Sequence, residues 1–158
     1  MKGELKECEL ADGSTASPRN PGILIADDMG LMLTLLKLEL EPRGFNVWLA
    51  VDGDDALDLY RRHRSQIDVV LLDVQMPGLD GPHTLEALQR FNPDVVACFM
   101  TENPGIYTEK DLLQRGAACV FKKPCQPAEV AICLQMLQQG PACPSLIPTE
   151  SEASRLDR

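Results

Sequence analysis

Basic residues are in the minority in this chain of 158 residues. Its 15 Lys and Arg residues are set against 24 Asp and Glu residues, which gives a formal net charge of −9. A protein that holds nucleic acid by its phosphates needs a basic surface, and so does one that docks on anionic lipid. We therefore expect neither nucleic acid nor a membrane among the partners.

Long apolar runs and metal-binding spacings are also missing from the sequence. No stretch approaches the ~18 consecutive apolar residues of a membrane span, and the polar start of the chain has no hydrophobic segment of the signal-peptide kind. We therefore predict a cytoplasmic protein. There are only two histidines, and none of the six cysteines forms a C-x-x-C pair, which argues against a zinc site.

The composition that remains, 44% hydrophobic and 25% charged, is that of a globular domain. Residues 1–20 mix Gly, Ser, Pro and charged residues, and we expect them to form a flexible N-terminal leader. Residues 140–158 contain three prolines and no helical period, and we expect a flexible C-terminal tail. One domain is expected between them, over residues 21–139.

This central region alternates short apolar runs with helix-like segments. The runs, rich in Val, Ile, Leu and Phe as in strands buried on both faces, are Ile23–Ala26, Val47–Val51, Val69–Leu72, Val95–Met100 and Ala118–Phe121. Amphipathic or capped segments at 30–41, 53–64, 81–91, 108–116 and 127–139 predict helices. Five βα units in a row predict a doubly wound α/β fold with a parallel sheet.

Four of the five runs are followed by polar residues that could bind a ligand, whereas the second ends in Val51-Asp52-Gly53, a turn and helix start. Asp27 and Asp28 follow the first, Asp73 the third, Thr101 the fourth and Lys123 the fifth. Ligands of such folds sit at the carboxyl ends of the strands, so we expect these side chains to share one crevice.

These residue types together suit phosphoryl transfer. Three converging carboxylates repel one another, and a hard cation such as Mg²⁺ relieves the repulsion. An ammonium and a hydroxyl, from Lys123 and Thr101, can contact phosphoryl oxygens. Asp73, which has no adjacent acid, is the best candidate for a carboxylate nucleophile. Taken singly, Asp27-Asp28 could be a polar turn, and Lys122 competes with Lys123 for the lysine role.

Four segments carry a resemblance to a known family. They are ILIADD at 23–28, LLDVQMPGLDG at 71–81, CFMT at 98–101 and VFKKP at 120–124. In their order and spacing they resemble the receiver domain of response regulators, the CheY-like family, here of the stand-alone, single-domain type. The resemblance implies a flavodoxin-like (βα)5 fold with strand order 2-1-3-4-5.

The resemblance also implies roles for single residues. Asp73 would be the phosphoacceptor, and it would bind Mg²⁺ together with Asp27, Asp28 and the backbone carbonyl of Gln75. Thr101 would be the switch hydroxyl. Lys123, which directly precedes Pro124, would bind the phosphoryl group, and the Lys123–Pro124 peptide bond would be cis. The phosphodonor would be a sensor histidine kinase or a histidine phosphotransfer protein, and a further protein would be the downstream target. Such a domain is a phosphoacceptor that signals, not an enzyme, although it can promote its own phosphorylation and dephosphorylation.

Two positions depart from the family pattern. The aromatic residue that usually stands three places before the lysine is replaced by Val120, and the small residue after the switch hydroxyl is replaced by Glu102. They favour an alternative function, a pseudo-receiver that acts as a constitutive protein-interaction module. A flavin carrier is disfavoured, because the Asp-rich loop after the first run lacks a hydroxyl-rich phosphate cradle. With 19 residues after residue 139, we expect no DNA-binding output domain.

Overall fold

The computed structural model of the chain describes residues 19–102 and 107–139. Five parallel strands form one sheet in the order β2-β1-β3-β4-β5, which confirms the fold class and the strand order. The strands are β1 (Gly22–Ala26), β2 (Asn46–Ala50), β3 (Val69–Asp73), β4 (Ala97–Thr101) and β5 (Cys119–Lys122). Strand order reverses beside β1, so the carboxyl ends of β1 and β3 flank the point where α/β folds place their ligands.

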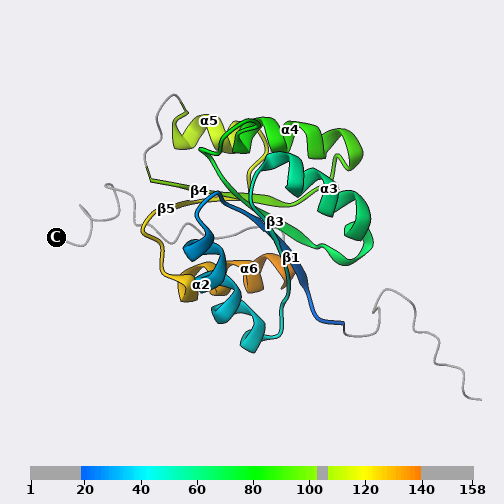
Figure 1. Cartoon of the computed structure of the whole chain (residues 1–158), viewed down its shortest axis with the longest axis vertical. Helices are drawn as coiled ribbons and strands as arrows, with labels where there is room; N and C mark the ends of the chain where they lie inside the picture. Colours follow the sequence, from blue (N-terminus) through cyan, green and yellow to red (C-terminus); the bar gives the residue numbers. More distant parts are fainter. Residues whose placement is uncertain (1–18, 103–106, 140–158) are drawn as a thin grey trace, which may run out of the picture.

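Helices cover both faces of the sheet (Figure 1). One layer contains α2 (Gly30–Leu40) and α6 (Pro127–Gln139). The other contains α3 (Gly53–His63), α4 (Gly81–Phe91) and α5 (Glu109–Gln114). Short 3₁₀ turns, η1 (Glu41–Arg43) and η2 (Arg64–Gln66), extend α2 and α3.

Capping residues in the sequence explain where several helices begin. Asp52 and Asp80 are N-caps whose carboxylates accept backbone N–H groups of the first turns of α3 and α4. Thr108 and Asp111 form a reciprocal capping box at the start of α5. After η1 the chain reverses through Gly44, whose φ of 95° lies in the region that glycine tolerates best.

The core is split by the sheet into two layers. Alternate strand residues point to opposite faces, so Leu24 packs on the α3/α4/α5 side and Ile25 on the α2/α6 side. Strands β1, β3 and β4 are buried at every residue, as near-continuous apolar runs predict for central parallel strands. The edge strand β2 is only partly buried.

Strand β4 begins two residues later than the apolar run predicts. The N–H of Val95 donates to the carbonyl of Asn92 at 3.0 Å, which makes a turn at the end of α4, and Val96 is 37% exposed. The apolar run therefore starts in the connection, not in the sheet.

Two expectations fall largely on residues that are not described. Of the expected leader 1–20 the structure describes residues 19 and 20, which are exposed, and the expected tail 140–158 lies outside the described residues. Among the helices of the described ranges, none has the length and apolar character that crossing a bilayer requires.

Candidate functional site

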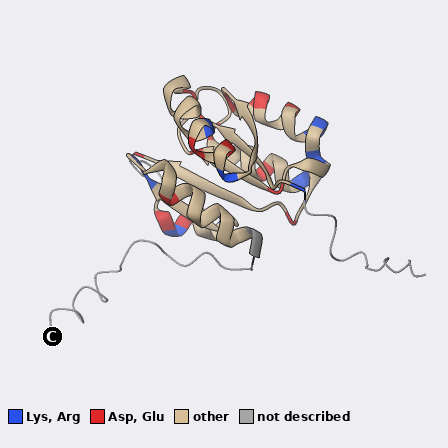
Figure 2. Cartoon of the chain, turned by 90° about the horizontal axis from the view of Figure 1, so that it is seen from below, with Lys and Arg blue, Asp and Glu red and all other residues tan. Residues whose placement is uncertain are grey.

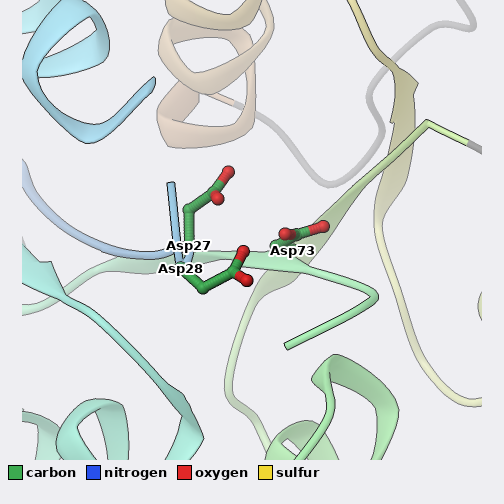
Figure 3. Close-up of side chains that lie close together, drawn as sticks. All are labelled: Asp27, Asp28 and Asp73. Carbon is green, nitrogen blue, oxygen red and sulfur yellow. The ribbon is translucent and has the colours of Figure 1, made fainter. Parts of the chain in front are cut away.

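The three aspartates predicted to share a crevice do lie together at the carboxyl edge of the sheet (Figure 3). Asp27 and Asp28 follow β1, and Asp73 is the last residue of β3. One carboxylate oxygen from each lies within 4.8 Å of the others. Asp27 and Asp73 are buried, whereas Asp28 is exposed, so the cluster has a closed side and an open side.

Lys123 reaches into this cluster from the segment after β5. Its Nζ lies 2.8 Å from Oδ2 of Asp27 and 3.3 Å from Oδ2 of Asp73, and its side chain is almost completely buried. The N–H of Lys123 donates to the carbonyl of Thr101, and the Lys123–Pro124 peptide bond is cis. Lys122 is exposed, so the geometry selects Lys123 between the two lysines.

The hydrogen bonds of Asp27 separate its role from those of the other two aspartates. Its Oδ1 accepts the N–H of Met29 at 2.8 Å, and its Oδ2 accepts the Lys123 ammonium. Both oxygens are therefore engaged within the protein. Asp28 and Asp73 line the open pocket, whereas Asp27 is not among its lining residues.

Burial and neighbouring charges shift the pKa values of two residues of the cluster, Asp73 and Lys123. Burial, followed by repulsion from Asp27, raises the pKa of Asp73 from 3.8 to about 6, although Lys123 and the N–H of Gln75 act in the opposite direction. Burial alone would lower the pKa of Lys123, but the hydrogen bond that its ammonium donates to Asp27 and the charges of Asp73 and Asp27 leave it above its ordinary value. Lys123 thus opposes the rise in the pKa of Asp73 but does not cancel the effects of burial and of Asp27.

The loop after β3 is held close to Asp73 by a glycine. A Cβ on Gly81 would overlap the carbonyl oxygen of Asp73 and lie 3.0 Å from Cα of Val74, so no other residue fits there without movement. The N–H of Gly81 donates to the carbonyl of Val74 at 3.0 Å. Within the loop the N–H of Gln75 donates to Oδ1 of Asp73 at 3.4 Å. The glycine thereby fixes the start of α4 against the end of β3.

A cavity of about 700 Å³ opens above Asp73. Two of its lining side chains, Asp80 and Tyr107, were not predicted as site residues from the sequence. Asp80 was recognisable only as a helix cap before Gly81-Pro82, and Tyr107 only as the residue before a capping box. Neither pattern distinguishes a pocket residue from an ordinary surface one.

The remaining predicted site residues fall in different environments. Thr101 is buried at the end of β4, one residue beyond the Met100 that pairs with Asp73. Glu102 is exposed and lines the same cavity as Asp73, so it adds a further carboxylate there. Val120 is buried on the α3/α4/α5 side and Phe121 on the α2/α6 side, so Phe121 does not occupy the family's aromatic position.

Charged residues of the described ranges lie on several helices and loops. Lys and Arg residues and Asp and Glu residues are both spread over several elements in the view of Figure 2. Several are paired along their own helix, such as Arg62 with Asp58 and Arg43 with Glu39. Exposed pairs of this kind contribute little to stability.

The donor set of the pocket fits a hard divalent cation. All three clustered side chains offer oxygen, without His or Cys, and Mg²⁺ prefers such ligands. Burial and, after it, the charge of Asp27 raise the pKa of Asp73, and Lys123 offsets these effects only in part. A cation between Asp28 and Asp73 would add positive charge beside both carboxylates.

Comparison with known proteins gives a consistent family. A family model described as response regulator receiver domain matches residues 23–135. The transcriptional regulatory protein PrrA of Mycobacterium tuberculosis is 34% identical over 119 residues, which cover 75% of this chain and 49% of PrrA. The transcriptional regulatory protein CpxR of Escherichia coli is 48% identical over 68 residues, 43% of this chain and 28% of CpxR. The chain thus spans about half or less of the length of these curated relatives.

Solved structures with the same fold include CheY in the CheX–CheY–BeF3–Mg²⁺ complex of Borrelia burgdorferi. That structure has a TM-score of 0.67 and 30% sequence identity, and the match covers 80% of this chain and 91% of the neighbour. The receiver domain of the Francisella response regulator 1452 has a TM-score of 0.70 and 28% identity, with 76% and 98% covered.

Proposed function

This chain belongs to the family of response regulator receiver domains of two-component signalling, and from that membership we propose that Asp73 is its phosphoacceptor. The observation that carries the proposal is the position of the Asp73 carboxylate. It lies at the floor of an open cavity, with Lys123 Nζ at 3.3 Å and two further carboxylates in the same cluster. This combination provides a nucleophile, a cation for phosphoryl oxygens and oxygen ligands for a metal.

The proposed reaction is transfer from a phosphohistidine to Asp73. A carboxylate oxygen of Asp73 attacks phosphorus, a P–O bond forms, and the P–N bond of the donor breaks. The leaving imidazole keeps the bonding electron pair and takes up a proton from solvent. The product is an aspartyl phosphate in a pocket that is already held together by the segments after β1, β3 and β5.

Lys123 would neutralise part of the charge on the transferred group. In the structure its ammonium is shared between Asp27 and Asp73. Because Asp27 holds Lys123 at 2.8 Å, the ammonium stays beside the acceptor when Asp73 is modified. Thr101, buried at the end of the neighbouring strand, is proposed to provide the switch hydroxyl.

The proposed metal ligands are Asp28, Asp73 and the backbone carbonyl of Gln75, with Asp27 in a supporting position. Bound Mg²⁺ would supply charge neutralisation for the phosphoryl oxygens. Because both Asp27 oxygens are already engaged by Met29 and Lys123, we expect Asp27 to act mainly by holding Lys123. A carboxylate oxygen can accept more than one hydrogen bond, so Asp27 could also accept one from a metal-bound water.

The partners follow from this chemistry in the proposal. A sensor histidine kinase or histidine phosphotransfer protein would be the donor, and the receiver would span residues 21–139.

The relatives are named transcriptional regulatory proteins, which runs against our expectation that nucleic acid plays no part. That name belongs to proteins of which this chain covers about half or less, so the output of this chain, like its cytoplasmic location, stays a prediction.

The proposal is tested by incubation with phosphoramidate and Mg²⁺, followed by intact-mass measurement. We expect the wild-type chain to gain one phosphoryl group and to lose this gain when EDTA replaces Mg²⁺. Asp73→Asn should gain none, whereas Asp94→Asn, which changes an exposed acid outside the cavity, should behave as wild type.

Two outcomes would overturn the assignment. A phosphoryl group that persists in Asp73→Asn would place the acceptor elsewhere. A wild-type chain that takes no phosphoryl group from any small donor, yet is folded, would favour the pseudo-receiver alternative that Glu102 and Val120 suggest.

A further inference from the structure

Tyr107 and Asp80 form a contact at the cavity rim between the starts of α4 and α5. Neither residue has a part in the phosphoryl transfer proposed above. The Tyr107 hydroxyl donates to Oδ2 of Asp80 at 3.2 Å, and both side chains line the cavity. Asp80 is the N-cap of α4, and Tyr107 directly precedes Thr108, the N-cap of α5. The contact therefore ties together the starts of two helices beside the acceptor.

Both carboxylate oxygens of Asp80 have fixed partners. Oδ1 accepts the backbone N–H of His83 at 2.9 Å and lies 2.6 Å from Nδ1 of the same residue. Oδ2 is held by Tyr107, whose ring packs against the buried core, with the Arg115 guanidinium 5.1 Å from the ring centroid. The Tyr107 hydroxyl is thus what restrains the second oxygen of Asp80.

The restraint matters because the cavity is strongly acidic. Its lining includes the carboxylates of Asp28, Asp73, Asp80 and Glu102, and within the described ranges Lys123 is the one Lys or Arg among the lining residues. A phosphodonor is an anion and must pass this rim to reach Asp73. Without the Tyr107 hydroxyl, Oδ2 of Asp80 would lose its donor while Oδ1 stays with His83. A carboxylate oxygen without a donor repels an anion more strongly than one that accepts a hydrogen bond.

We propose that Tyr107 is a positioning residue for phosphoryl transfer, which holds the Asp80 carboxylate at the rim and so keeps the path to Asp73 open to anionic phosphodonors. The inference rests on the proposed function of Asp73. It assigns to Tyr107 an effect on donor access, which acts through Asp80, and no part in bond making.

The test is a double-mutant cycle on phosphorylation by phosphoramidate with Mg²⁺. Tyr107→Phe should lower the second-order rate constant about three- to tenfold, and the loss should shrink at high salt, because screening weakens the repulsion. Asp80→Asn removes the charge but keeps a good N-cap. In that background Tyr107→Phe should have no further effect, whereas a purely structural role of the hydroxyl would give the same loss in both backgrounds.

Tyr60→Phe is the matched control. Tyr60 is the only other tyrosine, and its buried hydroxyl accepts a hydrogen bond from Nδ2 of Asn92 at 3.0 Å, away from the cavity lining. Its removal should leave the rate constant unchanged. This variant also leaves Tyr107 as the single phenol of the chain.

A second readout is independent of phosphorylation. Burial, then the charge and hydrogen bond of Asp80, raise the pKa of the Tyr107 phenol above its ordinary value. An alkaline absorbance titration in the Tyr60→Phe background should therefore give a lower pKa when Asp80→Asn is added. No change would refute the pairing of the two side chains.

The failures of the two proposals are distinguishable. A wild-type chain that is not phosphorylated on Asp73 refutes the proposed function, and the phenol titration still tests the pairing. If the wild type is phosphorylated but Tyr107→Phe reacts at the same rate, only the role of Tyr107 is refuted. The same holds if Tyr107→Phe lowers the rate constant equally with and without Asp80→Asn.

Discussion

Replacement of the Asp73 carboxylate by the uncharged amide of asparagine should stabilise the metal-free fold. In the structure Asp73 is buried beside Asp27, and its pKa rises from 3.8 to about 6. At 1.36 kcal/mol for each pH unit, this rise corresponds to about 3 kcal/mol of destabilisation of the charged form. Because the cavity admits water and Asp73→Asn also loses the Lys123 contact, we halve this figure and expect a gain of about 1.5 kcal/mol.

The sign of the pH dependence follows from the raised pKa. A carboxyl group that binds its proton more tightly in the folded state favours folding below the unfolded pKa, and this contribution is lost as pH rises through the folded pKa. The stability of the wild type relative to Asp73→Asn should therefore fall between about pH 4 and pH 6. Above about pH 7 the difference should be constant.

The assay is urea denaturation in EDTA at pH 4.5 and pH 7.5, with Asp94→Asn as a control that should stay within about 0.5 kcal/mol of wild type. Added Mg²⁺ should reverse the order at pH 7.5, because a cation that binds the folded state stabilises it. Equal or lower stability of Asp73→Asn at pH 7.5, or a gain that does not depend on pH, would refute the electrostatic reasoning.

Three further substitutions probe other parts of the site. Lys123→Met should destabilise the fold by about 3 kcal/mol in urea denaturation, because it leaves the fully buried Asp27 charge unpaired, and an unchanged midpoint would contradict the ion pair. Gly81→Ala should lower the free energy of unfolding by at least about 2 kcal/mol in the same assay, since its Cβ overlaps the main chain after β3. Gly30→Ala is the control, because a Cβ there meets open space, and it should be neutral or slightly stabilising. Thr108→Ala should cost about 1 kcal/mol and speed amide exchange in α5, and normal protection there would argue against the capping box.

Much of the fold could be predicted because its cause is local. Central parallel strands are buried on both faces, so they appear as short apolar runs, and β1 and β3 lie within one residue of the predicted bounds. Helix starts were marked by caps such as Thr108. The two-residue error at β4 has a physical reason as well, since Val95 and Val96 are apolar residues of a turn, and composition alone does not separate a turn from a strand.

The gathering of acids at one edge could also be predicted, because parallel strands must end on the same side. The pairing within the cluster could not. Lys123 and Asp27 are 96 residues apart, and whether the ammonium meets Asp27, Asp73 or both depends on how the segment after β5 packs. No local pattern could show that Asp27 has both oxygens engaged while Asp28 faces the cavity.

The sequence by itself determined the class of fold, the edge of the sheet where the chemistry lies and the residue types available there, because these depend on periodicity and on the direction of parallel strands. Only the tertiary structure decided that both Asp27 oxygens are engaged, that Gly81 must lie against the main chain of Asp73, and that Tyr107 reaches Asp80. These contacts depend on distances between side chains from separate elements, and such distances are set by packing of the whole domain.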